Sequence, residues 1–151
     1  MPDFPIREAR RDDVAAIVAM LTDDFLGANR ENQSDLAPYL AAFETMDADP
    51  NNNLFVVCDE NDEPIGTFQL IYMQGLSVGA CKRAEVEAVR IASTMRGQGI
   101  GKQMFDYAIE KARADGCGMM QLTTNKQRVD GQRFYDRLGF EASHIGYKMK
   151  L

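Results

Sequence analysis

A glycine-rich turn, RGQGIG at Arg96–Gly101, constrains this sequence more than any other feature. It follows a strand-like stretch at residues 83–91 and precedes residues 100–116, where apolar side chains recur at helical spacing and Gly116 is expected to end the helix. Such a turn directs several backbone N–H groups toward one point, with the positive end of the helix dipole behind them. The sequence therefore predicts a phosphate-binding site that is built from the main chain.

Two well-known phosphate loops do not fit these residues. A P-loop requires GxxxxGK followed by Ser or Thr, but here Arg96 and Gln103 occupy the first and last of those positions. The dinucleotide pattern GxGxxG requires a third glycine where this chain has Lys102. A nucleoside triphosphate with magnesium and NAD are therefore not supported.

Length and composition limit the classes of protein that need to be considered. The chain of 151 residues is expected to form a single domain, 1–151, and its 45% hydrophobic residues suffice for a core. There is no membrane-length apolar run and no signal-peptide pattern, and Cys58, Cys81 and Cys117 lack metal-ligand spacing, which predicts a cytoplasmic protein without a metal. A net charge of −6 disfavours nucleic acid and anionic membranes, but would attract a cationic amine.

The order of strand and helix patterns predicts a mixed α/β sheet. A strand at 4–10 precedes a helix that starts at Asp12 and Asp13, and a second helix is expected at 35–45. The remaining expected elements are a hairpin at 54–73, the strand at 83–91, the helix at 100–116, a strand at 119–124, a helix at 129–139 and two C-terminal strands after it. This uneven alternation favours a mixed sheet over a regular doubly wound one.

The strand before the glycine-rich turn carries two acids, Glu85 and Glu87. Period-two alternation predicts that both share one face with Val89 and Ile91. Carboxylates are costly in apolar surroundings, so this face is expected to meet solvent or a cleft, and their repulsion should raise one pKa. A carboxylate of that kind is a suitable base for an amine.

The wider pattern resembles the GNAT superfamily of acyl-CoA N-acyltransferases. Arg96, Gly99 and Gly101 fit its [RQ]xxGxG/A signature, and residues 134–140 (FYDRLGF) fit a motif that is frequent in the family. The resemblance covers essentially the whole chain. It implies a mixed, centrally splayed β-sheet flanked by helices, in which the fourth and fifth strands separate.

The resemblance also implies where acetyl-CoA, the expected cosubstrate, would bind. Backbone amides of the turn would hold its pyrophosphate, and the pantetheine arm would pair with the end of the preceding strand. The cofactor-binding residues implied in this way are Val89, Arg90, Ile91, Arg96, Gly97, Gln98, Gly99, Ile100, Gly101 and Lys102. Tyr135, Asn125 and Arg128 are further candidates, although many members have Asn at the position of Arg128.

Catalytic roles follow from the same resemblance. Glu87 matches the position of the base in many small-molecule enzymes of the family. Glu85 matches the position of the base in some protein acetylators, so it is the alternative base or a substrate-binding residue. Tyr135 is expected to protonate the leaving thiolate, and a backbone N–H near Arg90 or Ile91 to polarise the thioester carbonyl. The amine would attack directly in a ternary complex.

The acceptor remains open at this level. Residues 122–144 resemble aminoalkylphosphonate N-acetyltransferases, so Arg128 or Lys126 would contact an anionic group of a small amine or lie in solvent. A protein lysine or N-terminal acetyltransferase and a non-catalytic acyl-CoA sensor are the alternatives. His144, the only histidine, is interpreted as an ordinary surface or core residue, and a homodimer is compatible with the family.

Overall fold

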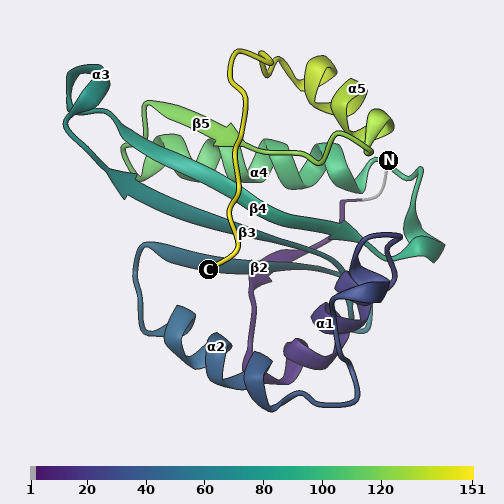
Figure 1. The fold of residues 1–151 in the computed structure, drawn as a ribbon. Helices are drawn as coiled ribbons and strands as arrows, with labels where there is room; N and C mark the ends of the chain where they lie inside the picture. Colours follow the sequence, from purple (N-terminus) through teal and green to yellow (C-terminus); the bar gives the residue numbers. More distant parts are fainter. Residues whose placement is uncertain (1–2) are drawn as a thin grey trace.

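The computed structural model describes residues 3–151 and contains one five-stranded sheet (Figure 1). The strands lie side by side in chain order: β1 (Ile6–Glu8), β2 (Asn52–Cys58), β3 (Pro64–Gln74), β4 (Lys82–Ile91) and β5 (Met119–Leu122). The pairs β1–β2, β2–β3 and β3–β4 are antiparallel, and β5 runs parallel to β4. The mixed sheet expected from the sequence is confirmed.

Helices cover both faces of this sheet, as Figure 1 shows. On one face, α1 (Val14–Thr22) and α2 (Ala37–Asp47) pack against Val56 and Cys58. On the other, α4 (Ile100–Ala114) forms the larger core with inward side chains of β2, β3 and β4. Also present are α5 (Val129–Leu138), the short α3 (Ser77–Ala80) and the 3₁₀ turns η1 (Arg11–Asp13), η2 (Gly27–Asn29) and η3 (Ser93–Met95).

The helix ends follow the chemistry of their sequences. Gly116 and Gly139 have φ of +86° and +94° just after α4 and α5, which is the left-handed conformation that glycine adopts most easily. The helices expected at 100–116 and 129–139 are therefore confirmed. Within residues 3–151, no helix combines the length and the hydrophobicity that crossing a bilayer requires.

The two strands expected after α5 are not present. Residues 141–151, here called the C-terminal tail, contain no strand, and the tail passes in front of the sheet toward β2 (Figure 1). Ile145, Tyr147 and Met149 are 74%, 90% and 84% exposed. Apolar residues alternate along the tail as they would in a strand, but in the described chain no neighbouring strand pairs with it.

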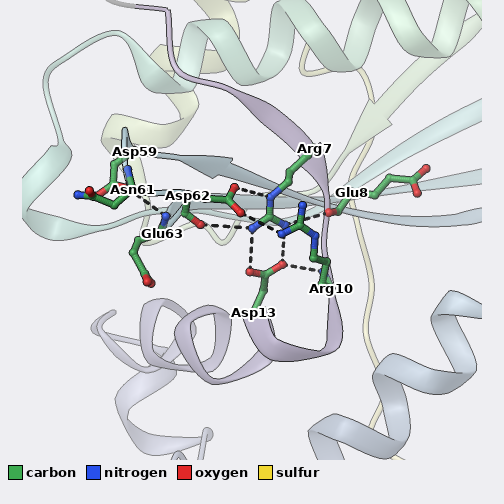
Figure 2. A network of polar contacts seen from close by, with 8 residues as sticks. All are labelled: Arg7, Glu8, Arg10, Asp13, Asp59, Asn61, Asp62 and Glu63. Atoms are coloured by element: carbon green, nitrogen blue, oxygen red, sulfur yellow. Dashed lines mark hydrogen bonds and ion pairs between the residues drawn. The ribbon is translucent and has the colours of Figure 1, made fainter.

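Around Arg7 of β1, polar side chains join three parts of the chain (Figure 2). The Arg7 guanidinium donates to both carboxylate oxygens of Asp13, at 2.7 and 3.1 Å, and its Nε donates to Asp62 at 2.8 Å. Arg10 bonds Asp13 through its backbone N–H and Asp62 through its guanidinium. These four residues, the Arg7 cluster, tie β1 and the start of α1 to the β2–β3 turn.

Candidate active site

The start of α4 presents unpaired backbone donors. Gln103 makes the first helical hydrogen bond, to the carbonyl of Gly99, so within residues 3–151 the amides from Gly97 to Lys102 have no backbone acceptor. Gly97 and Gly99 both have φ of +79°, and a Cβ at Gly97 would meet no atom within 4 Å. The turn is therefore open to solvent and has the geometry of an anion site.

Gly101 has a different role, which is packing. A Cβ at this position would lie 3.2 Å from the ring of Phe134 on α5 and 3.5 Å from Ile91 on β4. Its side-chain hydrogen lets α4 approach both elements closely. The glycine-rich turn thus combines an open stretch that faces solvent with a tight contact that fixes the first turn of α4.

β4 and β5 separate immediately beside this turn. Their parallel pairing runs from Arg83–Met119 to Val86–Leu122 and goes no further, although β4 continues to Ile91. The expected central splay is confirmed. In the part of the chain that the structure describes, one edge of β4 from Glu87 onward therefore has no strand partner and lies next to the free amides of α4.

A β-bulge interrupts β4 at Ala88. Thr67 pairs with Arg90 and Gln69 with Glu87, so β4 has one residue more than β3 at this point, and Ala88 has φ of +50°. Non-glycine residues rarely adopt a positive φ. The bulge reverses the alternation of β4 for every later residue.

The expected placement of Glu85, Glu87, Val89 and Ile91 on one face is therefore wrong in part. Glu85 and Glu87 do share a face. Ala84 and Val86, which alternate with them along β4, point into the core under α4, so the two acids lie on the opposite face. Val89 and Ile91 pack against that same core and so lie on the face opposite to the acids. The bulge also places Arg90 on the face of Glu85 and Glu87, which is the face that α1 and α2 cover.

Glu85 and Glu87 form a half-buried acid pair. The amide of Gln121 on β5 donates to Glu85 at 2.7 Å, which holds that carboxylate across the β4–β5 boundary. Burial raises the pKa of Glu87, and the neighbouring Glu85 raises it further, while Lys148 of the C-terminal tail partly opposes the shift. Glu87 thus has the raised pKa that the sequence predicts for one member of the pair.

Tyr135 lies on α5 among aromatic side chains. Its ring centroid is 5.6 Å from that of Phe105 and 5.5 Å from that of Phe134, both in edge-on contact. Burial raises the pKa of Tyr135, and the nearby charges of Arg90 and Arg128 act against that rise. The hydroxyl therefore stays protonated at neutral pH beside two cations.

Asp24, Arg90 and Arg128 form a second ionic group, here called the Asp24 cluster. Arg128 donates both guanidinium nitrogens to Asp24, at 2.8 and 2.7 Å, and lies over the ring of Phe25 at 5.2 Å. Arg90 is 3.7 Å from the same carboxylate, and its Nε is buried without a partner among the described residues. Hydrogen bonds from Arg128 lower the pKa of Asp24 to about 2.

Asp24 is the site residue that the sequence does not reveal. It lies 104 residues from Arg128 in the chain, in a segment without a recognisable motif, and only folding brings the two together. The sequence-based alternatives for Arg128 were contact with an anionic group of the substrate or exposure to solvent, and in the structure its guanidinium binds the carboxylate of Asp24. Lys126 and Asn125 are exposed, and the Asn125 side chain accepts from the Gln127 amide.

A small apolar cavity of about 130 Å³ lies between the helices and the sheet on the face of the acids. Leu54, Thr67, Gln69 and Ala88 contribute from the sheet, and residues of α1 and α2 form the rest of its wall. A larger cavity of about 300 Å³, at the end of α2 near Asp47, contains none of the site residues that the sequence predicts.

The single histidine and the three cysteines either lie outside the candidate active site or do not group as metal ligands. His144 is exposed in the C-terminal tail beside Ser143, and Cys58, Cys81 and Cys117 are unpaired thiols. Within residues 3–151, no three His, Cys, Asp or Glu side chains converge as a metal site would require.

Comparisons with known proteins agree with this architecture. Residues 14–140 match the Acetyltransferase (GNAT) family. An aminoalkylphosphonate N-acetyltransferase of Salmonella typhimurium is 30% identical, over 100% of this chain and 94% of that protein. A peptidyl-lysine N-acetyltransferase of the same organism is 26% identical, over 91% of this chain and 83% of that protein.

A solved structure supports the same conclusion at the level of the fold. A protein described as a transcriptional regulator from Bacillus halodurans C-125 is 44% identical and superimposes with a TM-score of 0.94, covering 99% of this chain and 100% of that one. The splayed sheet, the open turn at α4 and these matches together show that the chain belongs to the GNAT family of acetyl-CoA-dependent N-acetyltransferases.

Proposed function

We propose that this enzyme transfers an acetyl group from acetyl-CoA to the primary amine of a small molecule that also carries an anionic group. One observation carries the proposal most directly. The pairing of β4 with β5 ends at Val86, so an open strand edge, the free amides of α4 and the carboxylate of Glu87 lie at the same place. The acidic composition of the chain suits a cytoplasmic setting.

The residues at this place fit acetyl-CoA. Amides from Gly97 to Lys102 would hold the two phosphates, since the open turn at Gly97 lets an anion approach the main chain closely. The free edge of β4 from Glu87 to Ile91 would pair with the amide groups of the pantetheine arm. When bound, acetyl-CoA supplies the acetyl group as a thioester.

Glu87 and Tyr135 would handle the two protons of the reaction. An alkyl ammonium has to lose a proton before its nitrogen attacks, and Glu87 can accept it directly or through a water. Its raised pKa makes it a stronger base than an exposed carboxylate. Tyr135, protonated at neutral pH, would donate to the departing sulfur, and a backbone N–H near Arg90 or Ile91 would polarise the carbonyl.

The Asp24 cluster supports an anionic acceptor. Arg90 lies on the face of Glu87 because of the bulge at Ala88, and its buried Nε has no partner among the described residues. Two guanidinium groups share one carboxylate there, so a positive charge remains uncompensated. A phosphonate or similar group, as in the substrates named for the Salmonella relative, would complete the arrangement.

A panel of acceptors tests this proposal. Thiol release from acetyl-CoA is measured with aminoalkylphosphonates, with alkylamines of equal length that lack the anionic group, and with lysine peptides. We expect kcat/KM to be highest for the phosphonates. Faster turnover of peptides would support a protein acetyltransferase, and coenzyme A binding without turnover of any amine would support a sensor.

Glu87→Gln tests the mechanism separately. We expect kcat to fall about 10²- to 10⁴-fold, the usual contribution of a general base, while the affinity for coenzyme A stays within about twofold. Glu110→Gln on the exposed side of α4 is the matched control. A Glu87→Gln enzyme with the wild-type rate and pH profile would exclude Glu87 as the base.

A further inference from the structure

The apolar cavity of about 130 Å³ lies beside Glu87. Gln69 lines this cavity and pairs directly with Glu87 across β3 and β4. Residues opposite each other in an antiparallel pair have their side chains on the same face, about 5 Å apart. Ala88, which also lines the cavity, follows Glu87 in the chain and is exposed, as is Ala42 in the wall that α2 forms. The cavity therefore opens to the surface next to the Glu87 carboxylate.

The polar groups in the lining of the cavity are bonded to other parts of the chain. The Thr67 hydroxyl donates to a backbone carbonyl of β2 at 2.9 Å, and the Gln69 amide donates to Asn52 at 2.7 Å. The Tyr39 hydroxyl donates to Glu31 at 3.0 Å. The other lining residues are alanines and larger apolar side chains. A cavity of this composition binds hydrocarbon in preference to water.

The Asp24 cluster borders the same cavity through both of its walls. Leu21 of α1 lines the cavity and precedes Asp24 by three residues, and Ala88 of β4 lines it and precedes Arg90 by two. The bulge at Ala88 places Arg90 on the face of Glu87. A carboxylate, a group of cations and an apolar cavity therefore lie around this one bulge.

We infer that the apolar cavity receives a hydrocarbon substituent on the carbon that bears the amine of the acceptor. The inference rests on the proposed function, because it takes Glu87 as the site of the amine and the Asp24 cluster as the site of the anion. The cavity is only slightly smaller than an apolar protein cavity of about 150 Å³ that binds benzene. It therefore has room for a group of about four to six carbons, such as isobutyl or phenyl.

Three contacts to one carbon also distinguish its mirror images. In one enantiomer, the amine faces Glu87 while the anion reaches Arg90 and Arg128 and the hydrocarbon enters the cavity. The other enantiomer satisfies two of these contacts and has its third group misplaced. The enzyme should therefore prefer one enantiomer of an acceptor with such a substituent.

A series of acceptors tests the inference. It comprises aminomethylphosphonate, both enantiomers of the same compound with an isobutyl group on its carbon, and isopentylamine, which lacks the phosphonate. Each buried methylene is worth about fourfold in binding, so kcat/KM for one isobutyl enantiomer should exceed that for aminomethylphosphonate roughly 10²-fold. The other enantiomer should gain less than tenfold.

The same series separates the inference from the proposed function. Equal kcat/KM values for aminomethylphosphonate and both isobutyl compounds would overturn the inference and leave the proposed function intact. Isopentylamine as a better substrate than every phosphonate would overturn the anionic acceptor of the proposed function, and the inference with it.

Ala42→Leu tests whether the cavity itself holds the substituent. Leucine suits a helix and would fill part of the cavity from α2, so kcat/KM for the preferred isobutyl enantiomer should fall at least tenfold. The value for aminomethylphosphonate should stay within threefold, and so should the affinity for coenzyme A. Ala41→Leu, at the preceding exposed position of α2 and outside the cavity lining, is the matched control.

Met46→Ala is the opposite change, because it enlarges the same cavity. It should raise kcat/KM for a benzyl-substituted aminomethylphosphonate relative to the isobutyl compound by about tenfold or more. A substituent preference that neither Ala42→Leu nor Met46→Ala alters would overturn the inference, since the hydrocarbon would then bind elsewhere.

Discussion

Arginine and aspartate form two clusters in this protein, and the clusters differ in charge balance. In the Arg7 cluster, two guanidinium groups meet two carboxylates, and each charged group has at least one charged partner within 3 Å (Figure 2). In the Asp24 cluster, two guanidinium groups share one carboxylate, and Arg90 comes no closer than 3.7 Å.

The ionisation of the groups reflects this difference. Burial acts to raise the pKa of Asp13, but hydrogen bonds from Arg7 and from the Arg10 amide outweigh it, so the pKa of Asp13 is lowered. Contact with the carboxylates of Asp13 and Asp62 raises the pKa of Arg7. Burial, followed by the nearby Arg128, instead lowers the pKa of Arg90. A cation that is buried without full compensation weakens the fold unless another charge joins it.

The difference indicates that the Arg7 cluster is structural, and it supports our proposal that the Asp24 cluster binds the acceptor. Among the described residues, the charges of the Arg7 cluster balance, because two guanidinium groups pair with two carboxylates. The Asp24 cluster lies on the face of Glu87 and near Tyr135, and it retains both a free donor and a net positive charge. We therefore expect substitutions in the first to affect stability and those in the second to affect the acceptor.

Asp13→Ala should give the largest effect. It leaves Arg7 with Asp62 alone and removes the acceptor of the Arg10 amide, so the free energy of unfolding should fall by about 3 kcal/mol. Urea unfolding measures this, with the exposed Glu60→Ala in the β2–β3 turn as the control. An enzyme of unchanged stability but altered KM for the amine would reverse the assignment of the two clusters.

Arg128→Gln should have the next largest effect, and it should change the specificity for the acceptor amine. The fork of Arg128 already binds Asp24, so the variant removes one positive charge from the cluster, and kcat/KM for an aminoalkylphosphonate should fall roughly 30-fold, or about 2 kcal/mol. The kcat/KM for the matched alkylamine, which carries no anionic group, should change less than threefold. Arg133→Gln, at an exposed arginine of α5, the helix that follows Arg128, is the control. Equal losses for both amines would show that Arg128 does not recognise the anion.

Asp24→Asn tests the acid stability of the second cluster. The pKa of Asp24 is about 2 in the fold and near 4 when unfolded, so its ion pairs stabilise the protein above about pH 4. That contribution, about 2 kcal/mol, is lost as the pH falls from 4 toward 2. The unfolding free energy of the variant should depend less on pH in this window, while the exposed Asp23→Asn should behave as the wild type. The same slope in all three proteins would contradict the ion-pair geometry.

The features that sequence alone predicts are those with local causes. The glycine-rich turn, the glycine helix ends and the hairpin are fixed by backbone preferences of nearby residues, and the structure confirms them. The bulge has no such signal, because Ala88 is an ordinary strand residue whose positive φ is imposed by its neighbours. Asp24 joins the site only through folding, and the tail has a strand pattern but no strand partner among the described residues.

The smallest expected effect concerns the acid pair on the same face as Arg90, where the surplus charge is negative. Burial is the main cause of the raised pKa of Glu87, and Glu85 is the second. Glu85→Gln removes one negative charge, so the pKa of Glu87 should fall and the acidic limb of the kcat/KM profile should move to lower pH by less than about one unit. The limb should not return to the position of an exposed carboxylate, because burial remains. If the variant instead loses activity at every pH, Glu85 is the base and Glu87 only assists it.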